Sequence, residues 1–232
     1  MQLIVLPFNF MTKAASAALF GLLLLVAFAF TAPMGSHDYY GFYRYDYLLF
    51  FALTIQVCLL YLKLESWEEA KVIALFHIMA MGMEVFLTHP AIASWQYPQP
   101  AVFKLFTVPL FAGFMYSAVG SFFARSLRLY QVSFENLPTF SNMLLLAVIS
   151  YLNFMTKFFI PDIRVALFIW SVVIFWKTKL SFQIQNHRVK VPMLPILFLL
   201  ACLIWVAENI STFLEIWLYA SHVEARHLDG WA

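Results

Sequence analysis

Long apolar runs without charge constrain the fold of this chain more than any other feature. Residues 14–32 form a run of nineteen residues that contains no Lys, Arg, Asp or Glu. A helix that crosses a bilayer needs about 20 mostly apolar residues, because the hydrocarbon core is about 30 Å thick and each residue rises about 1.5 Å. Only 11% of the chain is charged, whereas soluble domains carry about 25% charged residues. The sequence therefore predicts an integral membrane protein.

The apolar runs predict an all-α fold, a polytopic membrane helix bundle of about seven transmembrane helices in one domain, residues 1–232. The expected spans are 14–32, 43–64, 67–89, 102–127, 141–158, 162–178 and 192–215. Ser66 and Glu69 form a capping box at the start of the third span. Ser141 is the expected cap of the fifth span, and Pro161 with Asp162 opens the sixth. Residues 177–190 are the most polar stretch and are expected to form a loop.

The distribution of Lys and Arg predicts the orientation in the membrane. Nine of them fall on the side of the N-terminus: Lys13, Lys63, Lys71, Arg125, Arg128, Lys177, Lys179, Arg188 and Lys190. Five fall on the other side: Arg44, Lys104, Lys157, Arg164 and Arg226. Because cytoplasmic loops carry an excess of basic residues, the N-terminus is expected to be cytoplasmic.

Several functional classes are excluded by composition and motif. A net charge of +2 without a basic block argues against nucleic-acid binding. The six histidines occur in no HxxxH or HExxH motif, so no metal site is expected. The last span has no lysine for a retinal Schiff base, and the chain has no Gly-rich phosphate loop or GxSxG motif. We therefore expect no cofactor.

Two carboxyl groups within apolar runs are the candidate catalytic residues. Glu84 lies near the end of the third span and Glu208 late in the seventh. An ionised carboxylate in a membrane costs about 3 kcal/mol on insertion scales. An acid that stays protonated there can donate a proton. The alternative is that both residues are polar staples between helices.

The other candidate site residues lie toward the non-cytoplasmic ends of the predicted spans. This distribution predicts a polar pocket that opens toward that side of the membrane. They are Arg44, Asp46, Trp95, Tyr97, Tyr116, Asn153, Asp162, Arg164, Asn209 and Trp217. The inner half holds His77 and little else. The charged members could form ion pairs with one another or bind an anion or a polar headgroup.

The two acids share a sequence pattern. Glu84 is followed by Trp95-Gln-Tyr97, and Glu208 is followed by Trp217-Leu-Tyr219. The pattern indicates a weak internal repeat, with each acid on a helix that runs outward to a Trp-x-Tyr exit. The alternative is an aromatic belt at the membrane interface.

Six segments carry a resemblance to a known family. They are Arg44–Asp46, Glu84–Phe86 with Ser94–Pro98, Val108–Ser121, Asn153–Phe154, Pro161–Arg164 and Ala207–Phe213. The chain resembles the YoaT-like family of uncharacterised bacterial integral-membrane proteins, which implies a multi-pass protein of the bacterial inner membrane and brings no established activity. Ala220 follows Tyr219 where the family pattern has proline.

A fainter similarity concerns the acids. A glutamate on a helix, a Tyr-rich exit and Val108-Pro-Leu are similar to the membrane carotenoid hydratases. Lycopene cyclases and membrane terpene cyclases use two acids on separate spans. The analogy implies that Glu84 takes the place of the first acid and Glu208 that of the second.

The expected function is that of a membrane-embedded enzyme that acts by acid catalysis on a lipophilic isoprenoid-like substrate, of cyclase or hydratase type. Its partners would be membrane lipid and that substrate, and association into a homo-oligomer stays open. One alternative is a proton-coupled transporter of a small molecule, which the lack of polar residues in the inner half argues against. The other is a non-catalytic membrane partner protein.

Overall fold

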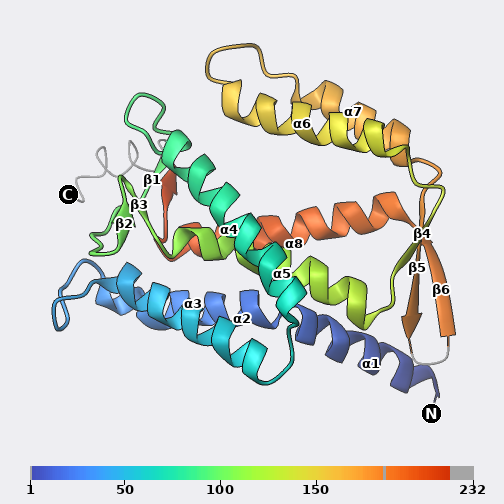
Figure 1. Ribbon diagram of the computed structural model, residues 1–232, viewed down its shortest axis with the longest axis horizontal. Coiled ribbons are helices and arrows are strands. Elements are labelled where there is room, and N and C mark those ends of the chain that lie inside the picture. Colours follow the sequence, from blue (N-terminus) through green and yellow to red (C-terminus); the bar gives the residue numbers. More distant parts are fainter. Residues whose placement is uncertain (1, 185–186, 220–232) are drawn as a thin grey trace. The chain divides into compact units, whose positions relative to one another are not determined.

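The computed structural model describes residues 2–184 and 187–219 (Figure 1). Ala220 and Arg226 lie outside the described residues. The chain divides into two compact units. Unit 1 comprises Met1–Lys13 and Ser126–Trp205, and unit 2 comprises Ala14–Arg125 and Val206–Ala232.

Each of the seven predicted spans contains a helix. The helices are α1 (Gln2–Ala17), α2 (Leu19–Thr31), the 3-10 turn η1 (Ala32–Met34), α3 (Arg44–Tyr61), α4 (Trp67–Leu87), α5 (Ala112–Leu129), α6 (Phe140–Thr156), α7 (Arg164–Phe175) and α8 (Met193–Phe213). Within the described part of the chain, α4 and α8 are long and apolar enough to cross a membrane. The helical segments Asn9–Ala17 and Leu19–Met34 would form a third candidate span if they cross the membrane together, with a bend of 66° between them. The seven-span bundle therefore stays a prediction.

Several predicted boundaries are wrong. Residues 104–109 form the short strands β2 (Lys104–Leu105) and β3 (Val108–Pro109), so the fourth helix begins ten residues after position 102. Pro109 cannot donate a backbone hydrogen bond and keeps the preceding residue extended, which delays the helix. Thr139, and not Ser141, accepts the capping bond of α6, from the amide of Asn142 at 3.4 Å.

The predicted start of the third span is confirmed. The hydroxyl of Ser66 accepts a hydrogen bond from the amide of Glu69, and the Glu69 carboxylate accepts one from the amide of Ser66 at 2.7 Å. This reciprocal pairing satisfies two amides that have no partner within the first turn of α4.

The fold is mostly helical but is not all-α. Where a loop was expected at residues 177–190, the structure has a hairpin of β5 (Lys179–Ile184) and β6 (His187–Pro192). A third strand, β4 (Ser133–Glu135), pairs with the edge of β5 opposite β6 (Figure 1). Leu180 faces Val191 and Phe182 faces Val189 across the hairpin. Such aromatic and β-branched pairs stabilise antiparallel strands. The alternation of apolar and polar residues along β5 is the strand signal that the polar composition obscured.

The core of unit 2 forms where α2 lies along α3 (Figure 1). Its fully buried side chains include Phe20 and Phe28 from α2, and Leu48 and Ala52 from α3. Phe111, directly before α5, joins the same cluster and contacts Phe28 edge-on at a centroid distance of 6.0 Å. The helix ends that carry the polar side chains are thereby held together.

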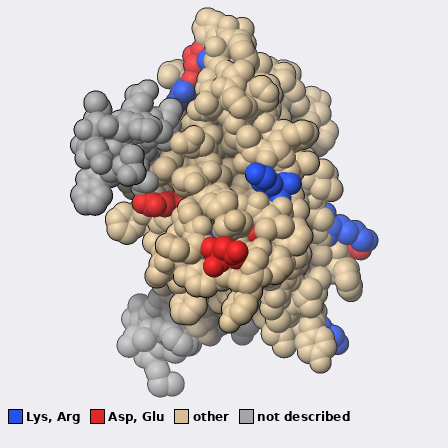
Figure 2. Space-filling view, turned by 90° about the vertical axis from the view of Figure 1, so that its left-hand side faces the viewer, with Lys and Arg blue, Asp and Glu red and all other residues tan. Residues whose placement is uncertain are grey.

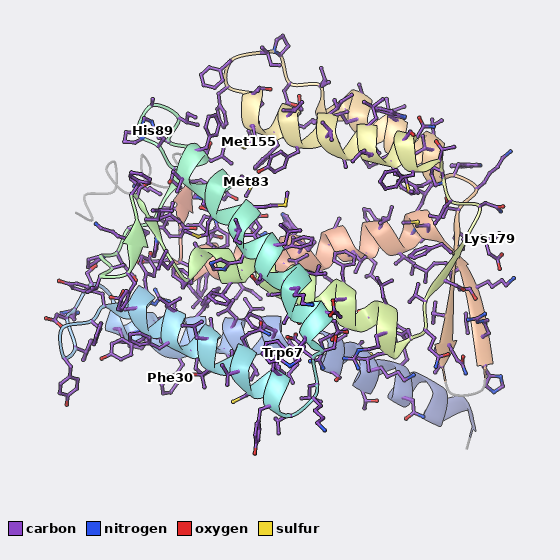
Figure 3. The ribbon with its side chains drawn as sticks, viewed as in Figure 1. Phe30, Trp67, Met83, His89, Met155 and Lys179 are labelled. Carbon is purple, nitrogen blue, oxygen red and sulfur yellow. The ribbon has the colours of Figure 1, made fainter. Side chains whose placement is uncertain are left out.

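Many large apolar side chains are exposed. Of α8, only Ser211 is buried within the described structure. Phe30 at the end of α2 is 85% exposed, and Trp67 at the start of α4 is 73% exposed (Figure 3). Figure 2 shows a face on which charged residues are few. Apolar surface of this extent is rare on soluble monomers and fits contact with lipid, in agreement with a membrane protein.

Gly113 allows α5 to approach α4. A Cβ atom at Gly113 would lie 2.5 Å from the ring of His77, whereas a Cβ at Gly82 on α4 would meet nothing within 4 Å. We predict that Gly113→Ala lowers the free energy of unfolding by about 1–3 kcal/mol, as overpacking does. Gly82→Ala should leave it unchanged or raise it slightly, because Ala favours the helix by about 1 kcal/mol. Thermal unfolding of both variants in detergent is the measurement, and equal melting temperatures would contradict this packing.

Candidate functional site

The Glu84 side chain is the centre of a buried hydrogen-bond cluster in unit 2. It is 1% exposed. Its Oε2 atom accepts hydrogen bonds from Trp95 Nε1 and from the Tyr97 hydroxyl, both at 2.9 Å. Its Oε1 atom accepts a hydrogen bond from the Tyr116 hydroxyl at 2.7 Å. Three of the candidate site residues, Trp95, Tyr97 and Tyr116, therefore meet on one carboxyl group.

The local chain path explains this convergence. The amide of Ser94 donates to the carbonyl of Leu87 at 3.0 Å, so the chain turns back directly after α4. This turn brings β1 (Trp95–Gln96) beside the last turn of the helix. The Tyr97 ring packs edge-on against Phe111 at a centroid distance of 6.2 Å. Tyr116, one turn into α5, completes the cluster.

The second acid is connected to the same cluster through the Trp-x-Tyr pattern. The Tyr219 hydroxyl donates a hydrogen bond to Glu208 Oε1. β7 (Leu218–Tyr219) pairs antiparallel with β1, which places Trp95 opposite Tyr219 with ring centroids 6.3 Å apart. Trp95 also donates to Glu84 at 2.9 Å, so it joins the hydrogen bonds of Glu84 to the ring of Tyr219. The two acids therefore lie at the two ends of one aromatic network.

The chemistry of the donors limits where a proton can reside. An indole N–H only donates, so Oε2 of Glu84 has to act as an acceptor. A proton on Glu84 is therefore placed on Oε1, opposite the Tyr116 hydroxyl, which can donate or accept. Burial raises the pKa of Tyr219 to about 12 and, together with the charge of Glu84, raises the pKa of Tyr97 well above its usual range. Both phenols stay protonated near neutral pH and remain donors.

Trp217 and Asn209 lie around Glu208 in different ways. The Trp217 indole is near enough to lower the pKa of Tyr219, against the larger effect of burial. Its ring also packs against the core of unit 2. Asn209 is on the exposed surface of α8, next to a half-buried Glu208. The surroundings of Glu208 are therefore more exposed than those of Glu84.

Arg44 is fully buried, and its side chain binds helix ends. Its guanidinium donates to the carbonyls of Phe28 at 2.8 Å and Leu214 at 3.0 Å, near the ends of α2 and α8. It also contacts Thr31 Oγ1 at 3.2 Å and Gln99 Oε1 at 3.4 Å. Carbonyls in the last turn of a helix lack the usual partner within the helix, and Arg44 donates to such groups.

Asp46 has a similar structural environment. Its carboxylate accepts hydrogen bonds from the amides of Tyr43, Val102 and Phe103 at 2.8–3.0 Å. These bonds fix the segment that leads from Tyr97 to α5. Arg44 and Asp46 thus support the aromatic cluster from outside.

The remaining predicted residues form a cluster of their own in unit 1. The Asn153 amide donates to Asp162 Oδ1 at 3.0 Å, and its carbonyl accepts from the amide of Ile163 at 2.9 Å. Arg164 pairs with Asp162 through its guanidinium. The cluster closes the turn between α6 and α7.

Sequence reasoning missed a second buried polar cluster. Glu65, just before α4, accepts from the Gln56 amide at 2.7 Å and from the Ser121 hydroxyl. Arg125, one turn further along α5, is 1% exposed and donates to Ser16 Oγ at 2.9 Å. Glu65 lies between the second and third predicted spans and Arg125 near the end of the fourth, so the statement that the inner half holds little besides His77 stays a prediction. Glu65 was not recognised because it precedes a capping box, where exposed acids are common.

Among residues 2–184 and 187–219, no group of three His, Cys, Asp or Glu side chains is placed to hold a metal ion. The expectation that the protein needs no cofactor stays a prediction.

Comparisons with known proteins place the sequence in a family. Residues 7–231 match the family described as "Protein of unknown function (DUF817)". The chain is 36% identical over 181 residues to "Uncharacterized protein YoaT" of Bacillus subtilis (strain 168), which covers 78% of this chain and 68% of that protein. No solved structure matches the chain.

Replacing Glu84 tests whether its three donors need an acceptor. In Glu84→Gln, the amide oxygen can accept from Trp95 and Tyr97 and the amide nitrogen can donate to Tyr116. We predict a change in unfolding free energy within about 1 kcal/mol. In Glu84→Leu three buried donors lose their partner, and we predict a loss of about 3 kcal/mol or more. Thermal unfolding in detergent checks both, with the exposed Glu68→Leu as the control, and an equally stable Glu84→Leu variant would contradict the cluster.

Proposed function

The chain belongs to the family described as "Protein of unknown function (DUF817)". From the cluster around Glu84 and Glu208, we propose that it is a membrane-embedded enzyme that protonates a lipophilic, isoprenoid-like substrate. The observation that carries the proposal is that two acids meet one set of aromatic side chains. Buried Glu84 accepts from Trp95, and half-buried Glu208 accepts from Tyr219, whose ring lies 6.3 Å from that of Trp95. Intramembrane acids are rare, and function is their default interpretation.

The proposed reaction assigns a role to each group. One carboxylic acid transfers its proton to an alkene carbon or epoxide oxygen of the substrate, which leaves a carbocation. The faces of the aromatic side chains stabilise this cation. The cation either is attacked by a second alkene of the substrate, which closes a ring and leaves a new cation, or adds water. The other carboxylate then takes a proton from the ring cation or from the added water, which gives a cyclised or hydrated product.

The difference in burial favours Glu208 as the group nearest the substrate. Glu84 has three donors around it and almost no exposed surface. Glu208 has one hydrogen-bonded phenol and is only half-buried, on a helix that carries no other charged residue. A lipophilic molecule that approaches from the bilayer would reach Glu208 first, and Glu84 would exchange protons with it through Tyr116 and Tyr219.

The proposal includes a membrane arrangement. α4 and α8 cross the bilayer, and the other helices complete a bundle of about seven spans with a cytoplasmic N-terminus in the bacterial inner membrane. The abundance of exposed apolar side chains on α6, α7 and α8 supports this arrangement. The similarity to carotenoid hydratases and terpene cyclases remains an analogy at the level of sequence pattern.

Proton-coupled transport is the second candidate, and one observation favours it. Buried acids lie at both ends of α4, with Glu65 before its start and Glu84 near its end. His77 lies between them on the same helix and packs on Phe114 at a centroid distance of 4.6 Å. Titratable groups at several depths are typical of proton pathways. Uptake into proteoliposomes driven by a pH gradient would distinguish transport from catalysis.

The enzyme proposal predicts a specific pattern among conservative variants. Cells that express Glu84→Gln or Glu208→Gln should accumulate the substrate and lack the product in their extracted lipids, as cells without the gene do. The reason is that an amide preserves the hydrogen bonds but cannot deliver a proton. Glu68→Gln, an exposed change of the same kind, should match the wild type.

One combination of results would overturn the proposal. If lipid profiles are the same with and without the gene, and the Glu84→Gln and Glu208→Gln variants behave as the wild type in every phenotype, both acids are staples between helices. The protein would then be a non-catalytic membrane partner.

A further inference from the structure

The hairpin of α6 and α7 contains a groove in unit 1. Its volume is about 430 Å³, within the range of about 300–1,000 Å³ that is usual for small-molecule sites. Every lining residue comes from α6, α7 or the turn between them. The groove therefore does not include any residue of the acid pair.

The lining of the groove is divided into two parts. Apolar side chains from both helices form its walls: Leu146, Phe154, Leu167 and Phe168. Lys157 and Arg164 lie at the turn end, with Asp162 as the one acidic lining residue. The formal charge of the lining is therefore +1.

Lys157 provides a cation that the hairpin itself does not neutralise. Its ammonium lies over the rings of Phe154 at 4.7 Å and Phe158 at 5.2 Å. In the described part of the chain, Asp162 pairs with Arg164 and no carboxylate pairs with Lys157. Arg164 has further N–H donors besides those directed at Asp162. A cation over aromatic rings beside an apolar groove suits a ligand with an anionic head and an apolar tail.

We propose that this groove binds an anionic phospholipid. The phosphate lies between Lys157 and Arg164, Ser150 donates a hydrogen bond to the head region, and one acyl chain follows the apolar walls. Phosphate suits both cations, because arginine binds it through parallel N–H donors and lysine as a point charge. Basic pockets between spanning helices bind lipid headgroups on the cytoplasmic side of membranes, and the same pairing of charges would operate here at the other face. Lys157 and Arg164 lie on the side predicted to be non-cytoplasmic, where the chain has fewer cations. Binding of an anionic headgroup would explain why two cations lie together there.

Lipid retention by the purified, delipidated protein tests the proposal. Native mass spectrometry would compare phosphatidylglycerol with phosphatidylcholine of the same acyl chains. We expect the wild type to retain one phosphatidylglycerol in preference to phosphatidylcholine. Lys157→Gln should weaken this retention about fivefold, the effect of one lysine near an anionic surface. Lys104→Gln, which removes an exposed lysine of unit 2, should leave it unchanged.

Two further arms keep the test decisive. Ser150→Leu fills the groove without a change of charge and should also weaken retention, even if Lys157→Gln fails to fold. Inorganic phosphate in excess should not displace the lipid, because it lacks the acyl chain. Equal retention of both lipids, equal behaviour of Lys157→Gln and Lys104→Gln, or displacement by phosphate would each overturn the lipid site.

Discussion

The hydrogen bonds to Glu84 are the interaction on which the arrangement of unit 2 depends. They join the end of α4, the segment around β1 and the first turns of α5. Each such hydrogen bond contributes about 0.5–1.5 kcal/mol, and a buried donor left without a partner costs about 1–3 kcal/mol. The pairing of β1 with β7 then attaches the end of α8 to the same point. One carboxyl group thereby determines where four chain segments meet.

Arg44 and Asp46 extend the same principle to the backbone. In an apolar environment each free carbonyl or amide has to find a partner within the protein. Arg44 binds the carbonyls near the ends of α2 and α8, and Asp46 binds three amides before α5. Charged side chains that the sequence suggested as ligand-binding groups therefore also explain how irregular segments are tolerated beside apolar helices.

The sequence predicted the helices well because apolar runs report directly on helical spans, and the capping box fixed the start of α4. It predicted the convergence of Glu84 with Trp95 and Tyr97 because all three lie close along the chain. The hairpin of β5 and β6 was not recognised, since its polar residues indicated a loop. Glu65 and Ser121 were also missed: their contact depends on how α5 packs beside the loop before α4. No local pattern reports such packing.

Infrared titration of the protonated carboxyl bands, with the protein in lipid, is the most direct measurement of whether Glu84 and Glu208 act as one unit. Coupled acids share their titration steps. If the two acids are connected through Tyr116 and Tyr219, the titration midpoint of the Glu84 band moves in both Glu208→Gln and Tyr219→Phe. A Glu84 band that titrates at the same pH in the wild type and in both variants would show that the acids are independent, and would contradict the proposed site.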